Sequence, residues 1–435
     1  MEEVEDEPLF CERVAGIDIG KAEISVTVRL PSETRRGGRR QEHRTFGTTR
    51  RQLGELAEWL RSLNVEKTGM ESTSGYWKPV YFLLEREGLE CILYQASQVK
   101  ALPGRPKTDK RDSVWLAKIT EQGSVAGSFV PPEDIRRLRT HTRYRRKLTQ
   151  MRTAEKERCE KLLEDGHLKL SSVISDIHGV SGRDMLNAII AGERDPRVPA
   201  EMARGRMRPK IRKLEEALDC EFFTEDHAFI LQMMLESIDG LTARIAVLDE
   251  KIAVLCEPYE RQIAQLDAVP GFGVTASQDL IAEIGIDMTV FPSPGHLCSW
   301  LRAAPGVKES AGRRKGKNAT GRGNPYAGGT LGETAASAGR TDTFLGAKYR
   351  RMCKRMPKKK ALGALMRTQA VIAHRLLSDP EAEYEELGSG YYEERLADTA
   401  RRARNHIRSL ERLGYHVQAS PVDPLTGEVI TPAAS

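Results

Sequence analysis

The chain has 435 residues, of which 30% are charged and 39% are hydrophobic, and its formal net charge is +6. This length allows two or three packed domains. No run of roughly 20 apolar residues is present and the first residues are acidic, which predicts a cytoplasmic protein without a membrane partner. Seven cysteines lie far apart without a Cys-x-x-Cys pair, which excludes a disulfide framework or thiolate zinc site and leaves oxygen ligands for any metal.

The first hydrophobic segment carries an aspartate where a core residue is expected. Val14 to Lys21 is an apolar, glycine-containing run broken by Asp18, and apolar residues then alternate from Ile24 to Leu30, which predicts a half-buried strand. An ionised carboxylate is costly to bury unless it is paired or bound to a metal. Asp18 is therefore a candidate metal or phosphate ligand, and a solvent-facing aspartate on an edge strand is the alternative.

Strands and helices alternate over the next 80 residues, which indicates a mixed α/β domain. Glu71 directly follows a predicted strand, in a position where open sheets place ligand sites. The expected elements are an exposed hairpin tip at Pro31–Arg44, a return strand from Thr45, helices at Arg50–Leu63 and Trp77–Glu87, strands at Val65–Met70 and Leu89–Tyr94, and a loop at Pro103–Thr108.

Two further acids begin the next predicted helix. Asp109 and Asp112 precede a helical pattern at Ser113–Thr120, and residues three apart on a helix share a face, so both can reach one cation. Acids in a first turn also cap a helix and stabilise its dipole, which is the competing explanation.

The middle of the chain is long, charged and helical. The patterns at Ile135–Leu163 and Leu241–Leu266 predict a helical hairpin or coiled coil, with Asp176–Pro209 as the connection. Self-association or an RNA-facing basic side are its possible uses, and no chemistry is visible there.

The C-terminal third combines a glycine turn, a serine loop and a block of basic residues. Pro270 to Gly273 resembles a helix-hairpin-helix turn, in which the amides at Gly271 and Gly273 can hold a phosphate, although a plain turn between helices would look the same. Residues 301–360 hold 16 Lys or Arg and three acids, which is typical of a surface that binds a polyphosphate. Ser310 lies in this block and is a candidate nucleophile for a phosphodiester, or an ordinary surface serine. The predicted helices at Thr330–Met356 and Ala361–Leu377 would pack behind this loop, and a charged tail follows Asp379.

Taken together, these motifs resemble a known family. Gly16-Ile17-Asp18-Ile19-Gly20-Lys21, Met70-Glu71-Ser72-Thr73-Ser74-Gly75 and Lys107-Thr108-Asp109-Lys110-Arg111-Asp112 are similar, in order and spacing, to the D-E-D-D motifs of insertion-sequence transposases of family one-ten. The segments Val269 to Gly273 and Ser310 to Pro325 resemble the two signatures of the C-terminal domain of the same family.

The resemblance implies an α/β RNase H-like (RuvC-like) domain at residues 1–130, a helical coiled-coil region at 131–265, a mainly helical transposase domain at 266–380 and a charged extension at 381–435. It implies a recombinase of a mobile element in a prokaryotic cell, associated with the nucleoid. A non-coding bridge RNA pairs with donor and target DNA, and dimers assemble into a tetramer. Asp18, Glu71, Asp109 and Asp112 match the family's ligands for Mg²⁺, and Ser310 matches its nucleophile. The residues expected to contact nucleic acid are Arg313, Arg314, Lys315, Lys317, Arg322, Gly271 and Gly273.

Some positions depart from the family pattern, and other functions compete with recombination. Ser113 stands where the family has a small alanine, Arg302-Ala303 replaces Gly-Leu, and Gly328 replaces a basic residue. A junction-resolving nuclease would use the same four acids with water as nucleophile. An actin-like kinase would explain the first phosphate loop, but its second phosphate turn and adenosine-binding glycines are not found.

Overall fold

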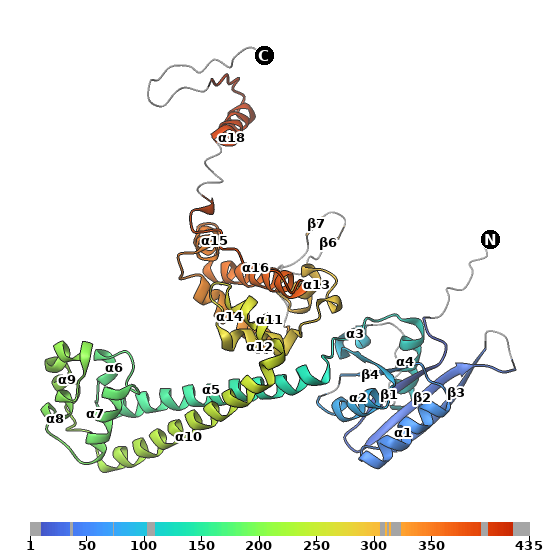
Figure 1. The fold of residues 1–435 in the computed structure, drawn as a ribbon, viewed down its shortest axis with the longest axis horizontal. Helices are drawn as coiled ribbons and strands as arrows, with labels where there is room; N and C mark the ends of the chain where they lie inside the picture. Colours follow the sequence, from blue (N-terminus) through green and yellow to red (C-terminus); the bar gives the residue numbers. More distant parts are fainter. Residues whose placement is uncertain are drawn as a thin grey trace. The chain divides into compact units, whose positions relative to one another are not determined.

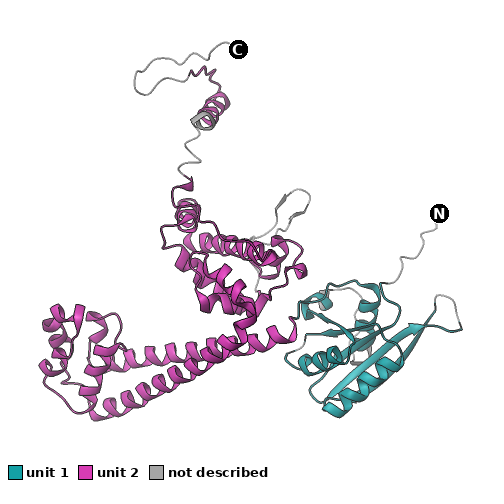
Figure 2. Cartoon of the chain, in the orientation of Figure 1, with its two compact units in different colours: residues 1–130 teal, residues 131–435 magenta. Residues whose placement is uncertain are grey.

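The computed structural model describes residues 10–34, 38–72, 74–101, 109–304, 309–310, 313–314, 323–392 and 399–420. Its contacts divide the chain into two units, residues 1–130 and 131–435, which are coloured separately in Figure 2.

Unit 1 is built on a five-stranded mixed sheet with the strand order β3-β2-β1-β4-β5 (Figure 1). β1 is antiparallel to β2 and parallel to β4, and β2 and β3 form an antiparallel hairpin while β4 and β5 run parallel. A three-stranded meander followed by two parallel strands is the RNase H-like topology, so the predicted fold class is confirmed. Its elements are β1 (Val14–Ile19), β2 (Glu23–Pro31), β3 (Arg39–Gly47), α1 (Arg50–Ser62), β4 (Lys67–Glu71), α2 (Trp77–Arg86), β5 (Glu90–Tyr94), α3 (Ala96–Ala101) and α4 (Asp109–Gln122).

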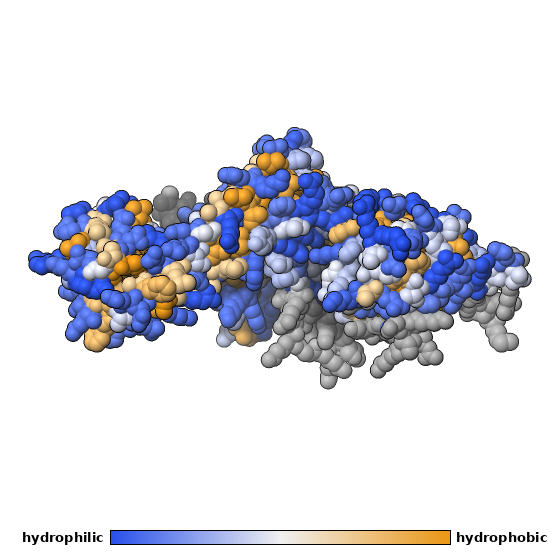
Figure 3. Space-filling view, turned by 90° about the horizontal axis from the view of Figure 1, so that it is seen from below, coloured by the Kyte–Doolittle hydropathy of each residue, from blue (hydrophilic) through white to orange (hydrophobic). Residues whose placement is uncertain are grey.

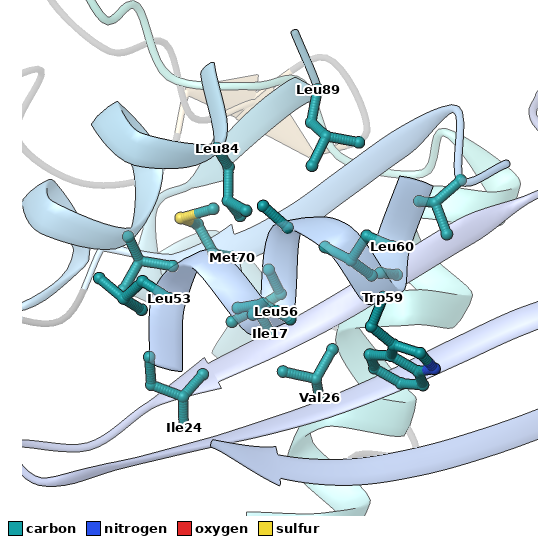
Figure 4. Close-up of a cluster of buried hydrophobic side chains, with 14 of the residues drawn as sticks. Ile17, Ile24, Val26, Leu53, Leu56, Trp59, Leu60, Met70, Leu84 and Leu89 are labelled. Atoms are coloured by element: carbon teal, nitrogen blue, oxygen red, sulfur yellow. The ribbon is translucent and has the colours of Figure 1, made fainter. Parts of the chain in front are cut away.

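The main core of unit 1 lies between one face of the sheet and helices α1 and α2 (Figure 4). Ile17 and Met70 contribute from the strands, and Leu56 and Leu84 contribute from the helices; all four side chains are completely buried. Apolar residues that recur every three or four positions place one stripe of α1 against the sheet. The other face of the sheet is left for α4, which contacts β1, β2 and β4.

The β2–β3 hairpin is longer than the sequence predicts. Pairing continues from Glu23 opposite Gly47 to Pro31 opposite Arg39, so the return strand begins at Arg39 and not at Thr45. The expected loop at Pro31–Arg44 was therefore wrong for Pro31 and for residues 39–44, which belong to the two strands. The ion pair between Arg39 and the buried Glu121 of α4 stabilises this extension of the strand.

Unit 2 begins with a long helical hairpin. Helix α5 (Glu133–Asp165) has 33 residues and packs along helix α10 (Glu225–Cys256), which has 32. The prediction that this arm begins at Leu241 was wrong, because Leu231, Leu235 and Ile238 of α10 are buried in a separate core at the far end of the hairpin. The connection also folds, into α6 (Leu170–Val173), α7 (Val180–Ile190), α8 (Arg197–Glu201), η1 (Gly205–Lys210) and α9 (Ile211–Ala217).

The rest of unit 2 is mainly helical. The expected helical stretch from Thr330 to Met356 is two helices, because the chain turns between Gly339 and Thr343. None of the helices in the described ranges has the length and apolar character that a membrane span requires. The elements are η2 (Glu257–Tyr259), α11 (Glu260–Asp267), α12 (Val274–Ile284), η3 (Met288–Val290), α13 (Pro294–Trp300), β6 (Glu309–Ser310), β7 (Arg313–Arg314), α14 (Pro325–Ala338), α15 (Phe344–Cys353), α16 (Lys358–Ser378) and α18 (Thr399–Arg412).

Candidate active site

The strand register places two of the predicted carboxylates side by side. β1 and β4 are parallel, and Ile17 lies opposite Met70. The next residue on each strand is Asp18 or Glu71, and both are half-buried. Side chains alternate between the faces of a strand, so Asp18 and Glu71 share the face opposite the core that contains Ile17 and Met70.

Helix α4 packs directly on the face that carries these two carboxylates. A Cβ atom at Gly16 would lie 2.1 Å from the carbonyl oxygen of Ser113, and one at Gly69 would lie 2.0 Å from the hydroxyl of Thr120. Gly16 and Gly69 are each two residues before an acid, on the same face of the sheet. The two glycines therefore let the helix backbone approach the strands that present Asp18 and Glu71.

The first turn of α4 is held against β2 by hydroxyl groups. Ser113 is fully buried, and its Oγ lies 2.8 Å from the Oγ1 of Thr27 and 3.3 Å from the Oγ of Ser25. Ser25 is the β2 residue opposite Asp18. Asp112, immediately before Ser113, is half-buried and lies in the first turn of α4.

The other end of α4 is tethered by charge. The Oε2 of Glu121 accepts a hydrogen bond of 2.9 Å from the Nε of Arg29, and its Oε1 lies 2.5 Å from the Nε of Arg39. The Glu121 side chain is 5% exposed, so its charge requires these partners. This contact was not predicted, although charged residues inside two alternating strands are a signal for it in the sequence.

Three of the four predicted metal ligands thus have described side chains. The backbone of Asp109 begins α4 in the same turn as Asp112, but the Asp109 side chain lies outside the described residues. Among the side chains that are described, no three His, Cys, Asp or Glu residues converge closely enough to hold one metal ion. The chemistry of the set still fits a hard divalent cation, because it consists of carboxylate oxygens.

The predicted nucleophile lies in a loop of unit 2 that is described only in part. The backbone of Ser310 in β6 pairs with that of Arg313 in the antiparallel strand β7. The side chains of Ser310, Arg313 and Arg314 lie outside the described residues, as do Lys315, Lys317 and Arg322 entirely.

The loop that carries Ser310 connects α13 to α14 and is called the serine loop here. Its two ends lie close together at its base. A Cβ atom at Gly323 would lie 2.4 Å from the carbonyl oxygen of Leu301, so glycine allows the chain to return close to where it left α13. The Oδ1 of Asn324 then accepts hydrogen bonds from the amides of Tyr326 and Ala327 and caps α14. The base of the loop is therefore ordered by packing and by capping.

A buried carboxylate fastens this base to the hairpin. The Nδ2 of Asn324 donates to the Oε2 of Glu283 at 2.5 Å, and Glu283 is 1% exposed. The Nε and Nη2 of Arg143 donate to the two Glu283 oxygens at 2.7 and 2.8 Å. Arg139 also donates to the carbonyl oxygens of Ala282 and Glu283, and burial lowers the pKa of its guanidinium to about 10.

A third arginine of α5, Arg145, is buried among carboxylates of α10 and α12. Arg145 is 5% exposed, and its guanidinium contacts Asp249 at 3.0 Å and Asp279 at 2.6 Å. These residues line a cleft of about 600 Å³ between the helices. Arg139, Arg143 and Arg145 therefore make contacts within the protein and do not contribute to an RNA-facing basic side, which is one of the two uses that the sequence leaves open for the hairpin. A signal that could have indicated this is the pair of acids, Asp279 and Glu283, four residues apart on a helix that has no other charged residue.

The two glycines of the turn between α11 and α12 differ in how closely other atoms pack around them. Gly271 has φ +91°, and a Cβ atom there would lie 2.2 Å from the carbonyl oxygen of Thr334. This close approach to α14 gives Gly271 a packing role. A Cβ atom at Gly273 would have no neighbour within 4 Å, so packing does not require glycine at this position.

Comparison with known proteins agrees with this architecture. Residues 15–167 match a transposase family model of the DEDD type from IS110 elements, and residues 263–350 match the model described as the transposase IS116/IS110/IS902 family. The protein named "Putative transposase y4qE" of Sinorhizobium fredii is 24% identical over 326 residues, which cover 72% of this chain and 69% of the relative.

Solved structures of Thermus thermophilus RuvC were also found. One is a complex with Holliday junction substrate at 15% identity and a TM-score of 0.20, and the other has 16% identity and a TM-score of 0.21. Each match covers 27% of this chain and 99% of the RuvC chain.

The RNase H-like sheet, the acids on its α4-facing side and the two family matches define an enzyme that cuts and rejoins DNA, a transposase of a mobile insertion sequence. More narrowly, the chain belongs to the IS110 family of transposases.

Proposed function

We propose that this transposase exchanges strands between donor and target DNA under the direction of a bridge RNA. The observation that carries the catalytic part is the packing of the first turn of α4 on the face of β1 and β4 that presents Asp18 and Glu71. Three acids from separate segments of unit 1 thereby belong to one end of one sheet face. Such a grouping suits the chemistry of a phosphodiester.

In this proposal Asp18, Glu71, Asp109 and Asp112 hold Mg²⁺, whose hard character matches carboxylate oxygens. When bound, the ion neutralises charge on the scissile phosphate and on the leaving oxygen. The protein holds the acids in place through Gly16, which admits α4, and through Ser113, which fixes its first turn.

Ser310 is the proposed nucleophile. Its Oγ bonds to phosphorus, the bond from phosphorus to the leaving sugar oxygen breaks, and the hydroxyl proton is transferred to the leaving side. A strand hydroxyl later attacks the phosphoserine and releases the serine, so rejoining needs no ATP. The basic residues Arg313, Arg314, Lys315, Lys317 and Arg322 would position nucleic acid here, together with the backbone amides of Gly271 and Gly273.

The bridge RNA would supply sequence choice by base pairing, while the basic block of residues 301–360 holds backbone phosphates. We also propose the division of unit 2 into residues 131–265, 266–380 and 381–435, and an association of the protein with the nucleoid.

Self-association into dimers and a tetramer is proposed from the hairpin. Its far end exposes apolar side chains, and Figure 3 shows apolar surface in that part of the molecule. Val180, Phe222 and Phe229 are 65%, 59% and 66% exposed, and exposed clusters of this kind commonly mark protein interfaces.

The test is covalent trapping with Mg²⁺, RNA and nicked DNA, read as protein mobility on a denaturing gel. Wild type should form an adduct that Ser310→Ala does not, and Asp18→Asn should form none while still binding RNA. DNA cleavage without an adduct in any variant would favour the alternative, a RuvC-like nuclease that uses water as nucleophile.

A further inference from the structure

Helix α18 (Thr399–Arg412) is amphipathic, and it lies beyond residue 350, where the second family match ends (Figure 1). With 100° between successive residues, Ile407 and Leu410 fall on one side of the helix. Arg408 and Arg412 fall on the other side. Ile407 is half-buried and Leu410 is exposed, so much of the apolar side of α18 is open to solvent.

The first half of α10 carries a second apolar stripe, on the side away from its core. Leu231 and Leu235 are buried in the core at the far end of the hairpin. Phe229 and Met233 lie on the opposite side of the same helix and are exposed. Gly240 continues this side, and a Cβ atom there would meet nothing within 4 Å. Phe229, Met233 and Gly240 are called the outer stripe below.

The two apolar surfaces have the same spacing. Phe229 and Met233 are four residues apart, as are Ala403 and Ile407 of α18, and Leu410 follows three residues later. Steps of four and three residues alternate in helices that pack side by side. At about 1.5 Å per residue the outer stripe is about 16 Å long, a length that the 14 residues of α18 can cover.

The charges of the two helices are complementary. Residues 225–240 of α10 include four acids and no Lys or Arg, whereas α18 has five arginines and one glutamate. Asp226 and Glu236 are exposed and lie on either side of the outer stripe. On α18, Arg404 and Arg408 are the arginines next to Ile407 on the helix surface. Opposite charges beside two matching apolar surfaces favour this pairing over others.

We propose that α18 of one copy packs on the outer stripe of a second copy, so that the copies are joined by their C-terminal arms. The proposal rests on the self-association proposed above and names the two surfaces that make the contact. It assigns a role to a helix that lies outside both family matches.

A second copy is favoured over the same chain because of reach. Tyr392 stacks on Phe344 of α15, and six residues separate Tyr392 from α18. Six residues reach at most about 22 Å, and the middle of α18 lies about 11 Å further. Met233 is about 35 Å along α10 from Cys256, where that helix ends. Within one chain the contact would therefore need residues 393–398 to be fully extended along the hairpin.

The test is disulfide cross-linking between two full-length proteins mixed in equal amounts. One carries Leu410→Cys and the other carries Met233→Cys, and the oxidised samples are run on a non-reducing denaturing gel. A covalent dimer should form in the mixture and in neither protein alone. Wild type treated in parallel measures the contribution of the native cysteines.

A matched control is available on the same side of α10. Val254 is exposed to a similar degree as Met233 but lies beyond the acidic half of the helix. Val254→Cys mixed with Leu410→Cys should give no more dimer than wild type. An equal yield with Val254→Cys and Met233→Cys would overturn the proposal, because random collision would then explain the cross-link.

A charge exchange tests the complementarity directly. Arg404→Glu with Arg408→Glu, added to the Leu410→Cys protein, should lower the yield of dimer by about tenfold, since attraction becomes repulsion. Asp226→Arg with Glu236→Arg, added to the Met233→Cys protein, should restore it. A yield that the second pair of changes does not restore would overturn the proposed pairing.

Sedimentation velocity of the wild type separates this proposal from self-association in general. Association of the wild type without a cross-link between positions 410 and 233 would overturn only the exchange of arms, whereas a monomeric wild type would overturn both proposals. A covalent dimer of Met233→Cys alone would indicate contact between two α10 helices instead. A protein with both cysteines that cross-links within one chain, at a rate independent of concentration, would overturn the assignment to a second copy.

Discussion

The hydroxyl of Ser113 lies 2.8 Å from the hydroxyl of Thr27, in the buried interface between α4 and the central sheet. Thr27 also contacts the Nδ1 of His43 at 3.1 Å, so the contact extends across β2 to β3. Through Ser113 the turn that carries Asp109 and Asp112 is joined to the strand that pairs with β1. This interaction therefore links the backbone turn that carries two of the predicted ligands to the strand beside a third, Asp18.

Replacing Ser113 by alanine should lower the free energy of unfolding by about 1 kcal/mol. The change removes a buried hydrogen bond to Thr27 and leaves that hydroxyl with one partner fewer. Urea unfolding followed by the fluorescence of the tryptophans in unit 1 measures it. Ser124→Ala is the control, because Ser124 is exposed. Equal changes in the free energy of unfolding for Ser113→Ala and Ser124→Ala would show that the buried contact between Ser113 and Thr27 does not stabilise the fold.

Gly16→Ala should displace α4 and abolish DNA cleavage. The new Cβ would lie 2.1 Å from the Ser113 carbonyl oxygen and 2.2 Å from the Ala117 amide nitrogen, so helix and strand must separate. We expect a loss of about 2 to 3 kcal/mol in stability. Gly54 of α1 is the matched control, since a Cβ atom there meets nothing within 4 Å, and Gly54→Ala should stabilise the helix by up to about 1 kcal/mol. Normal DNA cleavage by Gly16→Ala would contradict the conclusion that the active site requires the close packing of α4 on β1.

Glu283→Gln should loosen the base of the serine loop. The amide cannot balance the buried charges of Arg139 and Arg143, and breaking a buried pair costs about 3 to 5 kcal/mol. Hydrogen exchange at the amides of α12 and the start of α14 should accelerate strongly. Glu333→Gln is the control, because its ion pair with Arg146 involves a carboxylate that is 73% exposed and should contribute at most about 1 kcal/mol. Unchanged hydrogen exchange in Glu283→Gln would show that Glu283 does not hold the base of the serine loop in place.

Asp18→Asn should weaken Mg²⁺ binding by at least about tenfold, because one anionic oxygen ligand is lost from the proposed set. Isothermal titration of the protein without nucleic acid reads this effect separately from catalysis. Glu90→Gln is the matched control, since Glu90 begins β5 and pairs with Lys67 at the opposite end of the strands. The same affinity in Asp18→Asn and wild type would remove Asp18 from the metal site.

Local sequence patterns predicted most elements of unit 1 correctly. The apolar spacing in Arg50–Leu63 matches α1 (Arg50–Ser62), and the run at Trp77–Glu87 matches α2 (Trp77–Arg86), because each helix buries one continuous stripe. The pattern failed where burial depends on distant partners. β3 extends to Arg39 because that arginine meets Glu121 of α4, and α10 extends back to Glu225 because its first turns join the core of α6 to α9.

The sequence by itself predicted a mixed α/β domain for unit 1 and the order of the D-E-D-D acids, since these depend on residue type, spacing and local periodicity. The RNase H-like class followed from the resemblance of these motifs to a known family. Only the tertiary structure showed that Gly16 lets α4 pack closely on β1, and that Ser113 of α4 contacts Thr27. It alone also showed that Glu283 forms an ion pair with Arg143. The partners in the last two contacts are 86 and 140 residues apart in the chain. Periodicity reports which side of an element is buried, but the identity of the group that covers it is decided by packing between distant segments.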